Sequence, residues 1–270
     1  MKSVLNTMFL FTSQCSRIKP ASFFLLLPVL LSTFSPPAMT QEDIPSFVLE
    51  TEFGPGWQSR NDVKIPNDSL GTRFALDDIS GNGPWLTARL NLLWNLNDKH
   101  GVRVLLAPLS YEETGILNTN VNFAGASFQA DQPVEARYKF NSWRASYRYL
   151  MVDSDRWNLW IGGTLKVRDA EIKLTQNGLT SSDDDIGFVP LLYLASTYQL
   201  DERWSLKTEL DALAGGPGRA IDLGLRLDYR INDQWSAGAG FRTLEGGADT
   251  DDIYNFAWFN SVVLSTSFRF

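Results

Sequence analysis

Strict alternation of apolar and polar residues is the feature that most constrains this chain. From Ile221 to Ile231 every odd-numbered residue is apolar or aromatic, and every even-numbered residue is charged or glycine. Shorter stretches with the same pattern cover residues 86–94, 143–149, 157–166, 204–211 and 235–242. A period of two places alternate side chains on opposite faces of an extended strand, whereas a helix repeats every 3.6 residues. The sequence therefore predicts an all-β fold.

A short polar turn recurs between these strands. It occupies the same place in Trp94–His100, Tyr198–Trp204 and Tyr229–Trp235, and a longer copy covers Tyr149–Trp157. Each copy has an aromatic residue on both sides of a segment rich in Asp, Asn or Ser. Asp and Asn favour turns because their side chains accept hydrogen bonds from nearby backbone N–H groups. The flanking aromatic rings suit a membrane interface, where an apolar ring meets a wet edge.

The connections at the other ends of the strands are longer and rich in glycine or acidic residues. They are expected at Pro55–Pro84, Glu112–Ala136, Leu174–Ile186, Gly215–Arg219 and Glu245–Asp252. Short turns on one rim and long loops on the other are typical of barrels that cross a membrane with strands. The composition agrees, since aromatic residues make up 13% of the chain and include nine Trp.

Ten strands account for the pattern. They are expected near residues 46–54, 85–96, 101–110, 137–151, 156–172, 187–199, 203–212, 219–231, 234–244 and 255–270. The predicted fold is a transmembrane, antiparallel, up-and-down β-barrel of about ten strands, and eight or twelve strands remain open. Most segments reach the roughly 9–11 residues that a strand needs to cross a bilayer.

The first forty residues have the order of a secretory signal peptide. They contain three basic residues and no acidic one, then the apolar run Phe23–Leu31, and then small residues before Gln41. The apolar run is shorter than the roughly 20 residues of a spanning helix. We expect a signal peptide at 1–40, cleaved between Ala38 and Gln41, and a single barrel domain at 41–270. Cys15, the one cysteine, falls in the signal peptide.

The chain ends with apolar or aromatic residues at alternate positions, at Val262, Leu264, Phe268 and Phe270. In this ending the chain resembles outer-membrane β-barrel proteins as a group. The resemblance implies an outer-membrane location in a Gram-negative bacterium and contact with outer-membrane lipid and lipopolysaccharide. It also implies that the barrel-assembly machinery reads Phe268 and Phe270 as an assembly signal.

In a membrane barrel the apolar face points outward and the polar face lines the lumen. Fifteen charged residues share the inward phase: Glu50, Glu52, Arg89, Arg103, Arg144, Arg148, Lys166, Arg168, Lys207, Glu209, Asp211, Asp222, Arg226, Asp228 and Arg242. Eight of these are candidate binding residues: Arg144, Arg148, Glu209, Asp211, Asp222, Arg226, Asp228 and Arg242. Both signs occur, so the lumen is either a polar pore or a plug of ion pairs, and the narrow barrel favours the plug. On neighbouring strands Arg226 is expected to pair with Glu209 or Asp211.

Few residues suit catalysis or cofactor binding. The one histidine, His100, falls in a short turn without an evident acid or nucleophile partner. The acidic runs Asp183–Asp185 and Asp249–Asp252 lack the spacing of a calcium loop. The net charge of -7 argues against a nucleic-acid partner, and no cofactor or metal is expected. Three functions stay open: a non-enzymatic barrel for envelope structure or surface interaction, a narrow solute channel, and a lipid-acting surface enzyme.

Overall fold

The computed structural model describes residues 46–216 and 218–270. The predicted signal peptide and its cleavage position lie outside the described residues. None of the helices in the described part is both long and apolar enough to cross a membrane.

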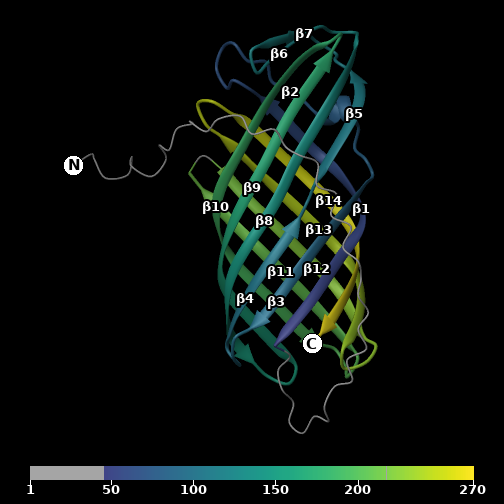
Figure 1. The fold of residues 1–270 in the computed structure, drawn as a ribbon, viewed down its shortest axis with the longest axis vertical. Coiled ribbons are helices and arrows are strands. Elements are labelled where there is room, and N and C mark those ends of the chain that lie inside the picture. Colours follow the sequence, from purple (N-terminus) through teal and green to yellow (C-terminus); the bar gives the residue numbers. More distant parts are fainter. Residues whose placement is uncertain (1–45, 217) are drawn as a thin grey trace, which may run out of the picture. The chain divides into compact units, whose positions relative to one another are not determined.

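Ten long strands of the described chain form a closed antiparallel barrel (Figure 1). Each strand pairs with the next around the ring, and β14 pairs with β1 to close it. The strands are β1 (Phe47–Lys64), β3 (Trp85–Asn95), β4 (His100–Ala107), β8 (Pro133–Asp153), β9 (Trp157–Gln176), β10 (Leu179–Gln199), β11 (Trp204–Gly215), β12 (Gly218–Arg230), β13 (Trp235–Asp249) and β14 (Tyr254–Arg269). The predicted all-β, up-and-down barrel of ten strands is confirmed.

Short turns connect the strands at one end of the barrel, which we call the inner rim. Their backbone hydrogen bonds follow a common pattern, as predicted. In three of them the first turn residue donates its N–H to the carbonyl of the residue that resumes the strand, from Leu96 to His100, Leu200 to Trp204 and Ile231 to Trp235. The side chain that follows, Asn97, Asp201 or Asn232, accepts two further backbone N–H bonds. Repeated turn chemistry therefore fixes the register of successive hairpins.

The opposite end of the barrel, which we call the outer rim, carries additional elements. These are β2 (Phe74–Ala75), α1 (Asp77–Ser80), β5 (Ser110–Ile116), and the hairpin of β6 (Val121–Phe123) and β7 (Ala126–Phe128). β2 pairs with β1, and β5 pairs with β8 beyond the end of β4. Figure 1 shows these segments gathered at the end of the barrel opposite the C-terminus.

The strands extend beyond their expected outer ends. The segment Leu174–Ile186, predicted as a loop, is mostly strand, because β9 and β10 continue to a tight turn at Asn177 and Gly178. Both turn residues have positive φ, 52° and 81°. β1 likewise runs on to Lys64 and β13 to Asp249. The prediction was wrong because outward side chains become polar above the apolar belt, so the alternation that marks a membrane strand disappears there.

Outward side chains form an apolar belt whose outer border is visible on β8 and β9. Trp143 and Val167 face each other on the outside, and one step outward Asn141 faces Asp169. Beyond this border Lys139 pairs with Asp169 at 2.7 Å. Apolar residues outside and charged residues inside are the inverse of a soluble barrel, so the predicted face assignment is confirmed.

The outer half of the barrel interior is mainly apolar and includes a small buried polar network around Gln58 and Asn61. Sixteen buried residues form this core, from the inner faces of the strands and from the rim segments. Phe123 of β6 and Phe128 of β7 are fully buried in it, as is Leu76 beside α1. The rim segments therefore fold into the mouth of the barrel and fill it. We call this cluster of sixteen buried residues the apolar plug.

Candidate functional site: a charged lumen beneath an apolar plug

The inner half of the lumen is filled by charged side chains. All eight candidate residues point inward, and seven of them are buried: Arg144, Arg148, Asp211, Asp222, Arg226, Asp228 and Arg242. Glu209 is half-buried. The alternation therefore placed each candidate on the correct face, and the structure joins seven of them in one ion-pair network, whereas Arg148 lies apart from it.

Asp222 of β12 lies at the centre of the network. It accepts hydrogen bonds from Arg89 of β3 at 3.0 Å, from Arg144 of β8 at 2.6 Å and from Arg242 of β13 at 2.7 Å. β3 and β8 are not neighbours of β12 in the ring. These bonds therefore cross the lumen rather than follow the wall.

Asp211 of β11 forms a second crossing point. It lies 2.5 Å from Nη2 of Arg103 and 2.6 Å from Nη1 of Arg144, and it also accepts a 2.6 Å bond from the Thr164 hydroxyl. Glu209 lies 3.0 Å from Arg103. A buried carboxylate is tolerated when it is paired with a cation and both of its oxygens accept hydrogen bonds, as those of Asp211 do.

The prediction that Arg226 pairs with Glu209 or Asp211 is wrong. Arg226 binds Glu52 at 2.6 Å and lies 3.4 Å from Glu50, both on β1, and no ion pair joins it to Glu209 or Asp211 in the described residues. The register explains the error, because Arg226 faces Lys207 on β11 and Glu209 faces Gly224. A like charge lies directly beside Arg226 on β11, so its closest acidic partner, Glu52, comes from β1, and Asp228 of its own strand lies 3.7 Å away.

Two buried cations have no carboxylate partner among the described residues. Arg148 lies over the ring of Trp160 at 4.2 Å, and Lys166 lies over the ring of Phe140 at 4.4 Å. Arg148 also donates to Asn95. Cation–π contacts of this kind stabilise a desolvated cation. Neither Phe140 nor Trp160 was predicted as a site residue, although both share the inward phase of their strands.

The charge of the inner lumen is unbalanced. Eight cations, Arg89, Arg103, Arg144, Arg148, Lys166, Lys207, Arg226 and Arg242, share it with six carboxylates, Glu50, Glu52, Glu209, Asp211, Asp222 and Asp228. The remaining cation of the predicted inward set, Arg168, pairs with Asp185 nearer the outer rim. The inner lumen therefore holds an excess of positive charge within a chain of net charge -7.

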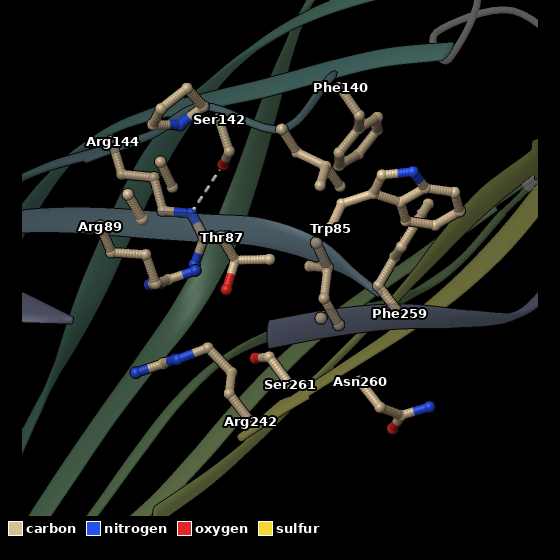
Figure 2. A pocket seen from close by; sticks show the side chains of 16 residues that line it. Trp85, Thr87, Arg89, Phe140, Ser142, Arg144, Arg242, Phe259, Asn260 and Ser261 are labelled. Atoms are coloured by element: carbon tan, nitrogen blue, oxygen red, sulfur yellow. Dashed lines mark hydrogen bonds between the residues drawn. The ribbon is translucent and has the colours of Figure 1, made fainter. Parts of the chain in front are cut away.

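A cavity of about 50 Å³ lies where the charged layer meets the apolar plug (Figure 2). Arg89, Arg144 and Arg242 line one end, and Trp85, Phe140 and Phe259 line the other. Trp85 stacks on Tyr111 at a centroid distance of 4.0 Å and donates from Nε1 to Glu113. Figure 2 shows the arginines and the aromatic rings on opposite sides of the space.

The remaining candidates lie outside this site. His100, predicted in a turn, is the first residue of β4 at the inner rim, and its Nδ1 lies 2.6 Å from the hydroxyl of Tyr147, a partner that the sequence did not suggest. Asp183, Asp184 and Asp185 lie on β10 rather than in a loop. No group of three potential metal-binding residues occurs within residues 46–216 and 218–270.

Comparison with known proteins identifies the fold of the chain. No family model matches the sequence, and no curated protein matches it. The outer membrane protease OmpT of Escherichia coli has 9% sequence identity, with 86% of this chain and 99% of that chain covered at a TM-score of 0.52. The attachment invasion locus protein Ail of Yersinia pestis has 12% identity, covering 83% and 99%, at 0.38. The toluene transporter TodX of Pseudomonas putida has 10% identity, covering 83% and 90%, at 0.31. The chain has the fold of outer-membrane β-barrel proteins.

Proposed function

We propose that this chain is a non-enzymatic, integral outer-membrane barrel with a closed lumen, which serves envelope structure or surface interaction through its outer rim. The observation that carries the proposal is the double closure of the lumen. Ion pairs cross its inner half at Asp211 and Asp222, and the rim segments fill its outer half with an apolar core. A barrel closed at two levels offers no continuous polar path for a solute.

The location and the lipid partners belong to the same proposal. The apolar belt with a polar border at Asn141 and Asp169 supports contact with outer-membrane lipid, and charged residues just beyond it, such as Lys139, suit lipopolysaccharide headgroups. The pairing of β14 with β1 supports a role for Phe268 and Phe270 in recognition by the barrel-assembly machinery.

The non-enzymatic part of the proposal rests on the position of His100. Histidine is the side chain that most often serves as general base, and a histidine-dependent surface enzyme would need it at the outer rim within hydrogen-bond reach of its partner. The one histidine of the chain lies at the inner rim, against Tyr147.

Single-channel recording on the purified, refolded barrel in a planar bilayer tests the closed lumen. The parent protein is expected to show no steady conductance steps. Regular steps that persist over a range of voltages would replace this proposal with the narrow-channel function.

A further inference from the structure

The ring of strand pairs is incomplete near the outer end of β3. On one side β3 pairs with β1 as far as Trp85, opposite Gly56. On the other side its pairing with β4 stops at Leu90, opposite Leu106. Within the described residues, Trp85–Arg89 therefore has a ladder partner on one side only. Pro108, which has no N–H to donate, follows β4 at this point and prevents the ladder from continuing.

This gap in the wall leads to the cavity between the charged layer and the apolar plug. The two margins of the gap both line the cavity, with Trp85, Thr87 and Arg89 on one side and Ala107, Pro108 and Leu109 on the other. Trp85 reaches over to β5, where it stacks on Tyr111 and so covers the outer end of the gap.

Arg89 offers unused hydrogen-bond donors beside this cavity. Its side chain is only 9% exposed, and its Nη2 has no hydrogen-bond partner in the described part of the chain. Its Nε also lacks a hydrogen bond and approaches Glu52 no closer than 3.7 Å. A buried, unpaired guanidinium donor favours an anionic acceptor. The excess of two buried cations in the inner lumen has the same effect.

The size and lining of the cavity restrict the ligand further. A volume of about 50 Å³ accepts a headgroup such as a carboxylate, whereas a benzene-sized group needs roughly 150 Å³. The rest of a ligand would have to lie in the gap, next to Leu86, a residue that is 80% exposed on the outer face of β3. A group in that position meets the apolar surface of the barrel.

We propose that this lateral gap binds a single-chain anionic amphiphile from the membrane. Its carboxylate accepts hydrogen bonds from Arg89, and its acyl chain leaves the barrel wall between β3 and the β4–β5 link. The site is separate from the outer rim, so it stands or falls independently of the surface function proposed above.

Equilibrium binding of radiolabelled dodecanoate to the barrel in phosphatidylcholine nanodiscs, corrected for empty nanodiscs, tests the site. Arg89→Gln is expected to weaken binding at least about tenfold, as the loss of a charge-assisted hydrogen bond predicts. Arg73→Gln removes an arginine from the exposed outer surface and serves as the matched control, with binding unchanged. Dodecanol, which has the chain without the charge, and acetate, which has the charge without the chain, are both expected to compete poorly.

Three results would overturn the proposal: unchanged dodecanoate binding in Arg89→Gln, equal competition by dodecanol, or equal competition by acetate. The last result would define a simple small-anion site. Asp222 keeps Arg144 and Arg242 in Arg89→Gln, so this variant is expected to fold. If it does not, Ala107→Leu provides the test, because it narrows the cavity and leaves every charge in place. Undiminished binding to the folded Ala107→Leu barrel would also overturn the proposal.

Discussion

At the residue scale, the inward charges pair both with neighbouring strands, as Arg242 does with Asp222, and across the lumen, as Arg144 does with Asp222. The sequence predicts which residues enter the lumen, since phase alone decides that. It does not predict which charges meet, because the choice between a neighbouring strand and the opposite wall depends on the width of the lumen and the tilt of the strands. Arg226 shows the difference, with Lys207 beside it on β11 and Glu52 reaching it from β1.

Arg226→Ala is expected to lower the free energy of unfolding by about 3 kcal/mol, at the low end for a broken buried pair. The loss is limited because Glu52 keeps Arg242 and Glu50 keeps Lys207. Urea titration of the refolded barrel measures it. In a double-mutant cycle, Glu52→Gln should couple to Arg226→Ala by about 1–3 kcal/mol, whereas Glu209→Gln should not couple. Coupling to Glu209 alone would contradict the pairing across the lumen.

Tyr111 anchors the apolar plug through a buried polar network. Its hydroxyl donates to Gln58 at 2.7 Å and accepts from Asn61 at 3.1 Å. Tyr111→Phe leaves both amides short of a partner, and we expect it to cost about 1–3 kcal/mol of unfolding free energy. Thermal unfolding of the two proteins at neutral pH checks this, and equal stability would show that water replaces the hydroxyl.

Tyr111 is also expected to make the folding stability of the barrel fall at alkaline pH. Burial raises the pKa of the Tyr111 hydroxyl above its ordinary value, so the folded protein keeps this proton longer than the unfolded chain does. Its contribution to stability is full below about pH 10 and is lost as the pH rises through the raised pKa. The free energy of unfolding, measured from neutral to alkaline pH, should therefore fall less steeply for Tyr111→Phe than for the parent.

At the scale of the elements, the strands within the membrane were predictable and their outer extensions were not. In the belt one face is apolar and the other polar, so residues such as Leu225 and Arg226 alternate visibly. Above the belt both faces are wet or plug-filled, and the stretch around Asp183–Asp185 reads as an acidic loop although it is part of β10. The rim segments fold into the mouth through contacts far apart in sequence, such as Phe74 with Phe123, which local patterns do not specify.

The terminal strand closes the barrel, and its last residue is expected to matter for assembly. The Phe270 N–H donates to the carbonyl of Phe47 at 3.0 Å, and the Phe270 ring contacts Phe268. Phe270→Ser should reduce the amount of assembled barrel several-fold in a membrane fraction. Leu70→Ser, which changes an exposed apolar residue in a rim loop, is the matched control and should assemble normally. Equal yields of the two variants would count against an assembly role for Phe270.

At the scale of the whole molecule, a barrel whose strands close into a ring should resist detergent. Every strand of the ring pairs with a neighbour on each side, although Trp85–Arg89 of β3 lacks a partner on one side, so no strand is a free edge along its whole length. The folded protein is therefore expected to migrate faster than the boiled protein in a detergent gel and to stay in membranes during a carbonate wash. Identical migration together with carbonate release would rule out an integral barrel.

The most direct test of the central claim, an apolar outside and a packed, ion-paired inside, is a spin-label scan along β12. Single cysteines replace Ile221–Tyr229 one at a time in the chain with Cys15 changed to Ser, and the labelled barrels are reconstituted in lipid. Labels at odd-numbered positions such as Leu225 should collide with oxygen dissolved in the lipid and not with a water-soluble nickel reagent. Labels at even-numbered positions such as Gly224 should be reached poorly by both reagents, because the lumen is filled. Strong nickel contact at the even-numbered positions would mean an open lumen, and strong nickel contact at the odd-numbered positions would mean that this face does not meet lipid.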